Sequence, residues 1–577
     1  MEKRWAQAPA RRDQLALFAE SLDEAIPAGH PIRLVERCLH LVDWTAWESR
    51  YASRRGQPPI HPRLMAGCIL YGLMRGIRSS RQLEDATRER VDFMWFLERR
   101  TVDHSTFAEF RVLFSKELKG LNRQIGRLIC ERYAEALLAL VIDGTRLRAN
   151  SDRHGARTAE HLERMVSACV RELDKKLEQL GQEDEKPAEA REVQGLREEI
   201  EKLRAQVAHY EQVLEVARCR DAAKRKKGGA GATAVRVPVT DPDAQVTPNK
   251  EGGFAPNFTP VVAVDPVSRL IVSGDVLAGS DENTAVLPAV AAAESLGGTA
   301  PERVLADTGF AAGDNLETLE EQGIEAYMPT STDFSERNPA NRSDPSQPVP
   351  EATWGELPKR GKQLAGAAFV YDASNDCYYC PMGRRLTRAR GGKYADSGVA
   401  YTQYTCPGKA GCPLAGDCVK EKASARMIVR DQYQGIRETV GRRMATPEGR
   451  AIYQKRAPVV EGVFAEIKHV LGIRRFLLRG LEKVRTEWTW ICTAFNLKRL
   501  LRLLASPRAA QGTRAENNSN VPRNPGVNES SAHALDAVER VQWTVRTPGV
   551  LRTLLSRWIG RHRRPTTTHT CVIAETG

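Results

Sequence analysis

At 577 residues the chain is too long for one ordinary core, so two to four domains are expected. Its 86 lysines and arginines exceed its 73 aspartates and glutamates, which gives a formal net charge of +13 and a pI near 9.2. This charge favours an anionic partner, most often nucleic acid, over a soluble protein with surplus basic residues. Because no long apolar run and no secretory leader is found, the sequence argues against membrane spanning and secretion, and we expect a cytoplasmic protein.

The first part of the chain, from about residue 15 to 118, has the pattern of several short basic helices. Two capping boxes are predicted to open helices in this part, formed by Ser79 with Gln82 and by Thr106 with Glu109. The second of these helices carries Arg111. Short capped helices with arginines are typical of a helix-turn-helix DNA-binding domain, and a plain helical bundle fits the pattern equally well.

An apolar, β-branched run at residues 139–142 ends abruptly on Asp143, and Gly144 follows it. The run predicts a central buried strand, and a carboxylate at its end would lie where the sheet meets solvent. An aspartate in such a place is more often a turn residue when it is taken alone. Its role therefore depends on partners elsewhere in the chain.

Residues 156–229 are strongly charged and helical. Apolar residues recur there at alternating spacings of four and three, at Leu196, Ile200, Leu203, Val207, Tyr210 and Leu214. This is the seam of a coiled coil, and the polar turn at 181–187 favours an antiparallel helical hairpin inserted into a domain. The basic run at 224–227, followed by glycines, indicates a flexible linker.

Strand patterns resume at residues 258–265, 270–276, 303–306 and 325–328, and helical patterns at 284–296 and 315–322. Strands followed by alternating helices and strands indicate an α/β sheet of mixed direction. The strand at 303–306 also ends on an acid, Asp307, which a Thr-Gly turn follows. Asp307 thus repeats the arrangement of Asp143.

A loop or linker is predicted at residues 330–362, and a cluster of cysteines follows it. Cys377 and Cys380 form a CxxC pair, and further thiols follow at Cys406, Cys412 and Cys418. Four thiolates suit a tetrahedral structural zinc site, so five candidates leave one spare. Zinc and reduced structural thiols both remain open, because the spacing differs from the usual pair of CxxC motifs.

Residues 452–504 are the most strongly helical part of the second half. An apolar stripe there has one acid on each side, Glu461 and Glu466. A basic surface follows, which includes Arg474, Arg475 and Arg479. Beyond residue 505 the composition turns polar, which predicts a disordered or weakly structured basic tail.

Two aspartates at adjacent strand ends, with an acid from a helix packed on the sheet, can bind two divalent cations. Ligands that are all oxygen favour Mg²⁺ or Mn²⁺. Two such ions activate a water or a 3′-hydroxyl and stabilise the leaving oxygen in a displacement at phosphorus. The surplus of lysine and arginine is suited to binding the phosphate backbone of such a substrate.

Several motifs, spread over residues 10 to 505, resemble those of the DDE transposases of bacterial insertion sequences. The first-aspartate motif is matched by residues 141–145 and the second by 306–310, while 453–468 matches the helix that bears the glutamate. Three stretches between the aspartates resemble the family as well, at 241–243, 253–258 and 263–265, and so do 474–480 and 494–500 near the C-terminus.

The resemblance implies an RNase H-like α/β core with a mixed five-stranded sheet, preceded by an all-α DNA-binding domain. A coiled-coil hairpin and a cysteine-rich insertion are expected to interrupt that core. The domains implied are 1–135 (helical DNA-binding), 136–155 and 231–330 (first and second parts of the core), 156–230 (hairpin), 331–430 (linker and Cys-rich zinc insertion), 431–505 (C-terminal helices of the core) and 506–577 (tail).

The resemblance also implies which glutamate acts with Asp143 and Asp307. Relatives carry a Tyr, Arg, Glu, Lys pattern in which six residues separate the glutamate from the lysine, and Glu461 with Lys468 has that gap whereas Glu466 does not. Tyr453 and Arg456 fill the first two places, but four residues rather than three separate Arg456 from Glu461. On a helical wheel Arg456 is therefore turned about 140° away from Glu461.

By this resemblance the protein binds terminal inverted repeats, cleaves DNA ends with Mg²⁺ or Mn²⁺, and joins them to target DNA. Metal ligands would be Asp143, Asp307 and Glu461 for magnesium, and Cys380, Cys406, Cys412 and Cys418, with Cys377 as the alternative, for zinc. DNA contacts would come from Tyr453, Arg456, Lys468, Arg474, Arg475, Arg479 and Arg111. The expected partners are double-stranded DNA and a second copy of the chain, as a dimer or higher assembly on DNA, at the bacterial nucleoid with no membrane. The alternatives are an inactive, domesticated DNA-binding protein and a metal-dependent nuclease without strand transfer.

Overall fold

The computed structural model describes residues 21–51, 58–133, 135–183, 190–228, 233–248, 252–277, 279 and 281–505. The tail predicted at 506–577 lies outside these residues. The described chain forms two compact units, one made of the residues up to Ile125 with those from Thr493 onwards, and one made of Gly126–Cys492.

The first unit is entirely helical, as expected. Its helices are α1 (Leu22–Ala25), α2 (Pro31–His40), α3 (Thr45–Glu48), α4 (Pro62–Met74), α5 (Ser80–Glu89), α6 (Val91–Phe96), α7 (His104–Leu113) and α8 (Ser115–Cys130), with the last part of α17 (Leu481–Ala505). Helix α4 is buried along almost its whole length, so it forms the centre around which the others pack.

One of the two predicted capping boxes is confirmed and the other is wrong. The Ser79 side chain accepts a hydrogen bond from the Gln82 amide at the start of α5, and Gln82 returns one to Ser79. Helix α7 instead begins two residues before Thr106, because the Asp103 carboxylate accepts from the amides of Ser105 and Thr106. An aspartate at the N-cap satisfies two free amides at once, which explains the earlier start.

The second unit is built on a mixed β-sheet. Its strands are β1 (Ala139–Gly144), β2 (Leu147–Arg148), β5 (Gln245–Pro248), β6 (Phe254–Val264), β7 (Ile271–Leu277), β8 (Arg303–Leu305) and β9 (Glu325–Tyr327). The order through the centre is β7, β6, β1, β8, β9, with β6 antiparallel to β7 and β1, and with β1, β8 and β9 parallel. The mixed direction predicted from the sequence is confirmed.

The sheet has seven strands rather than the five expected, because β6 is longer than its apolar pattern. Its second half pairs with β1 and β7, while its first half pairs with the short strands β2 and β5. The pattern at 258–265 missed the first residues of β6, where Pro256 and Asn257 interrupt the apolar run. Pairing with β2 and β5 satisfies their backbone instead.

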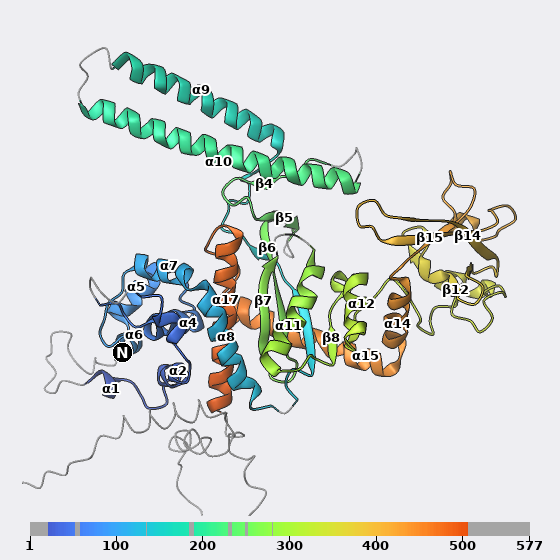
Figure 1. The fold of residues 1–577 in the computed structure, drawn as a ribbon, viewed down its shortest axis with the longest axis horizontal. Helices are drawn as coiled ribbons and strands as arrows, with labels where there is room; N and C mark the ends of the chain where they lie inside the picture. Colours follow the sequence, from blue (N-terminus) through green and yellow to red (C-terminus); the bar gives the residue numbers. More distant parts are fainter. Residues whose placement is uncertain are drawn as a thin grey trace, which may run out of the picture. The chain divides into compact units, whose positions relative to one another are not determined.

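Helices cover both faces of the sheet (Figure 1). On one face α11 (Val286–Gly297), α12 (Gly313–Glu321) and α14 (Gln434–Ala445) pack on apolar residues of β1, β6 and β8. On the other face lie α16 (Arg456–Ala465) and the first part of α17, where Trp488 and Cys492 approach Gly274 of β7 closely. These two layers hold the carboxyl ends of β1 and β8 in fixed positions.

The helical region between Pro447 and Val470 is divided, whereas the sequence suggested one helix at 453–468. Helix α15 (Pro447–Gln454) is followed directly by α16, and then by a single π-helical turn, η5 (Glu466–Val470). Because a π turn is wider than an α turn, Lys468 does not lie two regular turns beyond Glu461. In a regular helix a spacing of seven residues would put these two side chains on one face, and the π turn displaces Lys468 from it.

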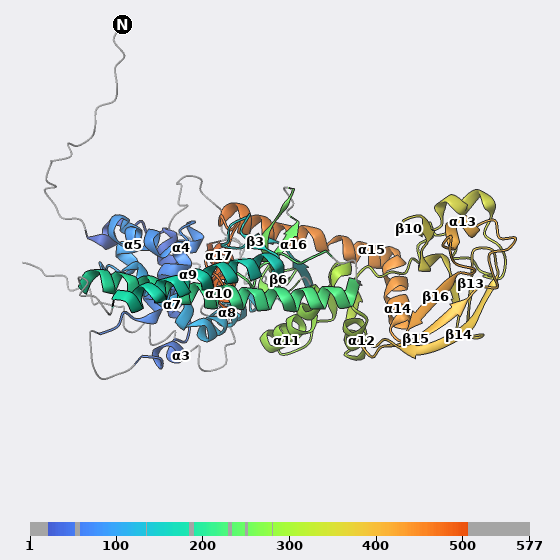
Figure 2. The same ribbon diagram turned by 90° about the horizontal axis from the view of Figure 1, so that it is seen from above.

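The inserted segment forms a helical hairpin of α9 (Ala159–Glu183) and α10 (Ala190–Gly228), which lie side by side in Figures 1 and 2. Ion pairs of Arg218 with Glu163 and of Lys176 with Glu199 show that the helices run antiparallel. At the base, β3 (Ala156–Arg157) pairs with β4 (Val237–Pro238). The helical hairpin predicted from the sequence is thus present.

The cysteine-bearing region is a separate antiparallel sheet inside the second unit. Its strands, in order, are β12 (Val370–Asp372), β13 (Cys377–Tyr379), β14 (Arg385–Lys393), β15 (Ala400–Thr405) and β16 (Met427–Asp431). Residues 330–362 before it are mostly irregular, as predicted, with short pieces η3 (Glu351–Glu356) and β10 (Lys359–Arg360). Cys380 and Cys418 are among its buried residues.

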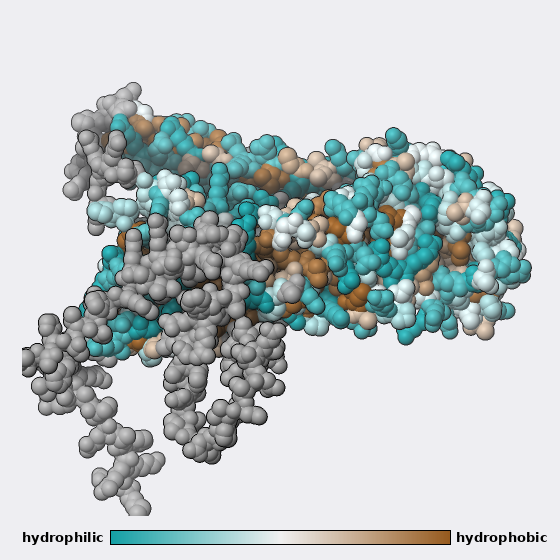
Figure 3. All heavy atoms as spheres, turned by 60° about the horizontal axis from the view of Figure 1, so that its bottom comes forward, coloured by the Kyte–Doolittle hydropathy of each residue, from teal (hydrophilic) through white to brown (hydrophobic). Residues whose placement is uncertain are grey.

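Hydrophilic side chains predominate on the face shown in Figure 3. Consistent with this surface, none of the helices formed by the described residues is long and apolar enough to cross a membrane.

The turn after Cys380 generates a stability prediction. Gly383 has φ +68°, and a β-carbon there would lie 2.1 Å from the carbonyl oxygen of Ser346, whereas Gly398 has φ +70° and open space around it. We expect Gly398→Ala to cost about 1 kcal/mol for its left-handed backbone, and Gly383→Ala about 2 kcal/mol more because the backbone of Ser346 must move. Hydrogen exchange of the β13 and β14 amides measures both losses, and equal losses would contradict the packing described.

Candidate functional site

Asp143 and Asp307 lie at the carboxyl ends of two neighbouring parallel strands. Val141 of β1 is in register with Leu305 of β8, and each aspartate lies two residues further along its strand direction. Parallel pairing therefore brings both carboxylates to the same edge of the sheet. This is the arrangement that the repeated strand-then-acid pattern predicted.

Local contacts orient both carboxylates. Asp307 precedes the short helix η2 (Thr308–Phe310), and its Oδ1 accepts a hydrogen bond of 2.8 Å from the Gly309 amide. Asp143 Oδ1 accepts one of 3.0 Å from the Gly144 amide. Its other oxygen, Oδ2, lies 3.4 Å from Nη1 of Arg456, whose side chain is 15% exposed.

A third carboxylate, Glu282, lies between the two aspartates. It opens the short helix η1 (Glu282–Ala285), and a β-carbon on Gly144 would be 2.6 Å from its Oε1 while one on Gly309 would be 2.9 Å from its Oε2. Burial raises the pKa of the Glu282 carboxyl, and the negative charges of Asp307 and Asp143 raise it further. Two glycines, one beside each aspartate, leave the space that this side chain fills.

Asn283 fixes the position of Glu282. Its Oδ1 accepts a hydrogen bond from the Ala312 amide, and its carbonyl accepts one from Nδ2 of Asn315. These bonds attach η1 to the segment that begins at Asp307, so Glu282 and Asp307 are positioned together. Sequence reasoning missed Glu282 because four residues separate it from the end of β7, although it too is an acid that follows a strand.

The two glutamates considered in the sequence take different places. Glu461 is exposed on α16, whose residues Val459, Val460 and Val463 are buried against the sheet, and no hydrogen bond or ion pair joins it to either aspartate within the described chain. Glu466 is half-buried at the start of the π turn. The structure therefore does not bring Glu461 to the aspartates in the way that it brings Glu282.

The other residues of the Tyr, Arg, Glu, Lys pattern do reach β1 and its extension. The Arg456 guanidinium lies beside Asp143 and 5.9 Å from the centre of the Tyr453 ring. Lys468 donates a hydrogen bond of 2.5 Å from Nζ to Oγ1 of Thr145. On the helical wheel Arg456 and Glu461 lie on different faces of the helix. The face that carries Arg456 is the one that contacts Asp143.

The donor set fits divalent cations that prefer oxygen, because Asp143, Asp307 and Glu282 offer six carboxylate oxygens at one edge of the sheet. Across the described ranges, no three His, Cys, Asp or Glu side chains are close enough to hold one metal ion in common. The negative charges of Asp143, Asp307 and Glu282 repel one another, which accounts for three carboxylates that lie near each other but do not converge on one point. Arg456 supplies a partial counter-charge at Asp143.

Comparisons with known proteins give two matches, both to families of transposases. Residues 20–113 match the transposase domain family DUF772, and residues 379–501 match the transposase DDE domain family. Together the two matches support a DDE transposase of an insertion sequence. No curated protein and no solved structure matches the chain. Glu461 lies inside the second match, whereas Asp143, Glu282 and Asp307 lie between the two.

The arginines predicted to bind DNA are placed differently in the two units of the chain. Arg474, Arg475 and Arg479 are exposed and follow the π turn, and Arg474 contacts His469 while Arg479 donates to the carbonyl of Asn150. Arg111 is half-buried in the helical unit and donates to the carbonyl of Arg78. That bond gives Arg111 a structural task in addition to any contact with DNA.

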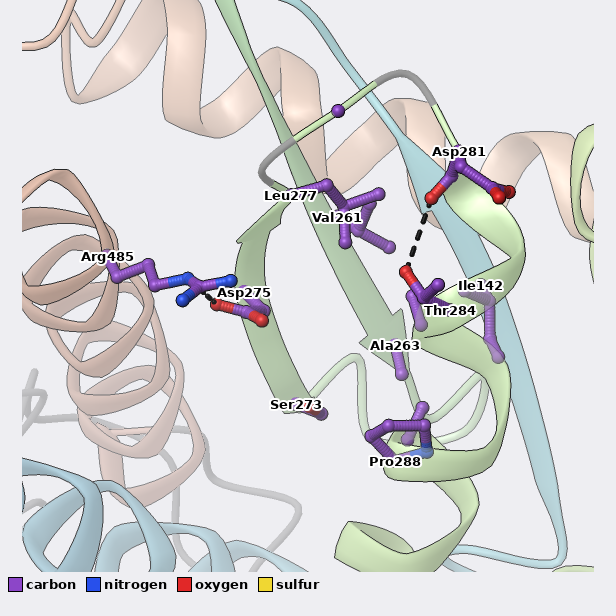
Figure 4. Close-up of a pocket in the computed structure, with 13 residues that line it drawn as sticks. Ile142, Val261, Ala263, Ser273, Asp275, Leu277, Asp281, Thr284, Pro288 and Arg485 are labelled. Atoms are coloured by element: carbon purple, nitrogen blue, oxygen red, sulfur yellow. Dashed lines mark hydrogen bonds and ion pairs between the residues drawn. The ribbon is translucent and has the colours of Figure 1, made fainter. Parts of the chain in front are cut away.

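A pocket of about 360 Å³ lies on the α11 face of the sheet, beside the carboxylates but without including them (Figure 4). Its floor is apolar, with Ile142, Val261 and Ala263, and the ion pair between Arg485 and Asp275 lies at its side. The pocket ends close to η1, since Asp281 and Thr284 line it. Of the two acids that line it, Asp275 is paired with Arg485, and neither Asp143, Asp307 nor Glu282 is among the lining residues.

Four of the five clustered cysteines approach one another. The pKa of the Cys418 thiol is raised to about 11, chiefly by burial; Arg426 opposes this rise, and the nearby Cys380, Cys406 and Cys412 contribute to it. Cys377 is fully buried in β13 and is not part of this set. These are the four thiols that the sequence favoured for zinc, and they lie in one neighbourhood, although no three of them are close enough to share a metal ion among the described residues.

Backbone amides point at two of these sulfurs. The Arg426 amide donates to Sγ of Cys406 over 3.2 Å. The Cys380 thiol receives hydrogen bonds from the amides of Met382 and Arg384, which partly offset the rise in its pKa caused by burial. Amides directed at a sulfur favour its thiolate form.

Proposed function

We propose that this transposase binds the terminal inverted repeats of a mobile element, cleaves the DNA at its ends and joins those ends to target DNA. The observation that carries the proposal is the pair of carboxylates, Asp143 and Asp307, at the ends of two neighbouring parallel strands in a chain that matches transposase families. Excess positive charge on the chain supports a DNA substrate.

We infer that the sheet is an RNase H-like core. The central order β7, β6, β1, β8, β9, with β6 alone antiparallel to the others, supports this assignment. The hairpin of α9 and α10 would be an insertion with a coiled-coil seam, since Ile200 and Leu214 of the predicted seam are buried. The helical first unit would bind the repeats, and two copies of the chain would assemble on DNA.

Magnesium or manganese would be held by Asp143 and Asp307, with Glu461 as the third ligand in keeping with the resemblance. When bound, the ions supply an activated hydroxyl and stabilise the leaving oxygen. Asp143 and Asp307 would position the cations at the edge of the sheet, and Lys468, which donates to Thr145 just beyond Asp143 in the chain, would donate to a phosphate oxygen. Arg456 must leave Asp143 when a cation binds there, and is then free to pair with the DNA backbone.

Glu282 would be a further ligand that is already in place before DNA binds. Its carboxylate reaches both glycines that adjoin the aspartates, whereas Glu461 is exposed on a helix and requires a change of side-chain position. The proposed order is that Asp143, Asp307 and Glu282, which are not close enough to share an ion as they stand, draw together on the first cation, and that Glu461 completes the site on the DNA complex.

Cys380, Cys406, Cys412 and Cys418 would draw together around one structural zinc ion. Amide groups directed at Cys380 and Cys406 support thiolate ligands, and the five-stranded sheet around them has only a small core to stabilise it otherwise. Cys377 would stay a buried thiol.

The first prediction from the proposed function concerns cleavage. Asp143→Asn and Glu461→Gln are expected to abolish Mg²⁺-dependent cleavage of DNA that carries a terminal repeat, because each removes a ligand of the reacting centre, while binding of the same DNA stays nearly unchanged. A gel assay of cut and joined products, run beside an affinity measurement, checks both. Cut products without joined ones from the unmodified protein would identify a nuclease instead.

Glu466→Gln is the matched control for this assay, since Glu466 lies in the same helical region and does not fit the family spacing. It is expected to cleave normally. Normal cleavage by Asp143→Asn would remove the proposed function, and an active Glu461→Gln with an inactive Glu466→Gln would reverse the choice of glutamate.

A second prediction separates Glu282 from Glu461. Without DNA, Glu282→Gln is expected to weaken Mn²⁺ binding roughly tenfold, because an oxygen ligand between the aspartates is lost, while Glu461→Gln changes it less than about twofold. Titration followed by electron paramagnetic resonance of free Mn²⁺ measures the affinities. Glu294→Gln, an exposed change on the adjoining helix α11, is the control, and equal affinities for all variants would refute the role of Glu282.

The third prediction concerns zinc. Metal analysis of the purified protein is expected to find about one zinc ion per chain, and Cys412→Ser, which alters a half-buried thiol, is expected to lose it. Cys377→Ser should retain the metal. Zinc-free protein, or loss of zinc from Cys377→Ser alone, would contradict the proposed ligand set.

A further inference from the structure

A second pocket, of about 340 Å³, lies at the base of the helical hairpin and is strongly basic. It is lined by Arg153, His154, Arg157, His161, Arg236 and Phe254, together with smaller residues, and no aspartate or glutamate is among the described residues that line it. We call these six side chains the basic pocket. Neither the sequence motifs nor the carboxylate site accounts for it.

Three pieces of backbone bring these side chains together. Arg157 belongs to β3, which pairs with β4 immediately after Arg236, and Phe254 begins β6, which pairs with β5. The Arg157 guanidinium donates to the carbonyls of His154 and Ala156, so it is oriented before any ligand binds. The strand pairing therefore brings the positive charges together, because it places the backbone of these residues close to one another.

The chemistry of the pocket fits a nucleic-acid strand. Guanidinium groups bind phosphate oxygens, and no acid at the pocket competes for them. Phe254 is 63% exposed beside these cations, which is unusual for a large apolar side chain and gives a flat surface on which a base can stack. A small anion would use the arginines but would leave the phenyl ring without a partner.

The register of β6 relates the basic pocket to the carboxylates. Phe254 lies eight residues from Val262, which pairs with Asp143, so at about 3.3 Å per residue the two places are roughly 26 Å apart. A DNA strand advances about 3.4 Å per nucleotide, which makes this distance about eight nucleotides.

The interval between the two places is also basic. After Asp143 the chain runs back along β6, where exposed Arg146 and Arg148 alternate with buried Leu147 and Ala149. The backbone of Arg475, which is also exposed, forms a β-bridge with that of Arg148. Exposed arginines thus belong to the segments that lie between the carboxylates and the pocket, and a bound DNA strand could contact them there.

We propose that the basic pocket binds the backbone of one strand of the substrate DNA about eight nucleotides from the bond that is cleaved, with an unpaired base of that strand stacked on Phe254. This inference rests on the proposed function and adds a specific contact to it, distant from the reacting phosphate. The contact anchors the DNA to the base of the hairpin, so the strand is held on both sides of the interval.

The test begins with DNA affinity. Arg153→Gln with Arg236→Gln is expected to weaken binding of a mixed-sequence duplex of about 30 base pairs roughly tenfold and to lower the salt dependence of binding by about one phosphate contact. The matched control removes two exposed arginines of the hairpin, Arg171→Gln with Arg197→Gln, and is expected to bind within about twofold of the unmodified protein. Fluorescence anisotropy over a range of salt concentrations measures both.

Phe254→Ala tests the stacking contact. It is expected to weaken binding of an oligothymidylate of about 20 nucleotides by about fivefold or more, and to affect the duplex less, since stacking requires an unpaired base. Equal effects on the two probes would remove the stacking part of the inference.

Phosphate ethylation interference locates the contact. On DNA cleaved at a mapped bond, the unmodified protein is expected to show interference about eight nucleotides from that bond, and the Arg153→Gln, Arg236→Gln protein is expected to lose it there alone. If the Arg153→Gln, Arg236→Gln protein cleaves DNA and shows neither weaker DNA binding nor a changed interference pattern, the inference is overturned and the proposed function stays intact. Failure of the unmodified protein to bind DNA would overturn both.

Discussion

The parallel pairing of β1 with β8 is the constraint on which the candidate site depends. It holds Asp143 and Asp307 at one edge of the sheet although their charges repel each other, and the repulsion must be offset by packing elsewhere. Buried strands between two layers of helices supply that packing. The guanidinium of Arg456 further reduces the electrostatic repulsion at Asp143. This is consistent with a site in which the guanidinium leaves Asp143 only when a metal cation replaces it.

The two aspartates could be predicted because each is specified locally, by an apolar strand that stops on an acid. Glu282 could not, because its place depends on how η1 packs against η2 through Asn283, and that contact joins segments far apart in the sequence. The same reason hid the basic pocket. Arg153, Arg236 and Phe254 are separated by about a hundred residues of hairpin and loop, and only the pairing of β3 with β4 and of β5 with β6 collects them.

The family pattern of Tyr453, Arg456, Glu461 and Lys468 indicated the helical region that contacts the end of β1. It did not indicate the directions in which these side chains point. Regular helical geometry relates these residues only if the helix is uniform, and here a helix boundary and a π turn interrupt it. The turn widens just before Lys468, which lets its ammonium group reach Thr145 on the extension of β1. An irregular turn of this kind often adjoins a functional residue, since it redirects a side chain without altering the packing of the preceding turns.

Strand β6 joins the two places at which we propose that DNA is held. Its second half lies in the centre of the sheet beside Asp143, and its first half, which pairs with β2 and β5, leads to the basic pocket. Because a strand paired on both sides changes little in length, the separation of the two places is fixed by covalent and hydrogen-bonded structure. The helical hairpin enters the chain between β3 and β4, next to that pocket. A DNA strand anchored at the pocket would reach the carboxylates over this fixed distance. Because the hairpin enters outside β6, its length can change without altering that distance, and the position of the reacting phosphate is kept.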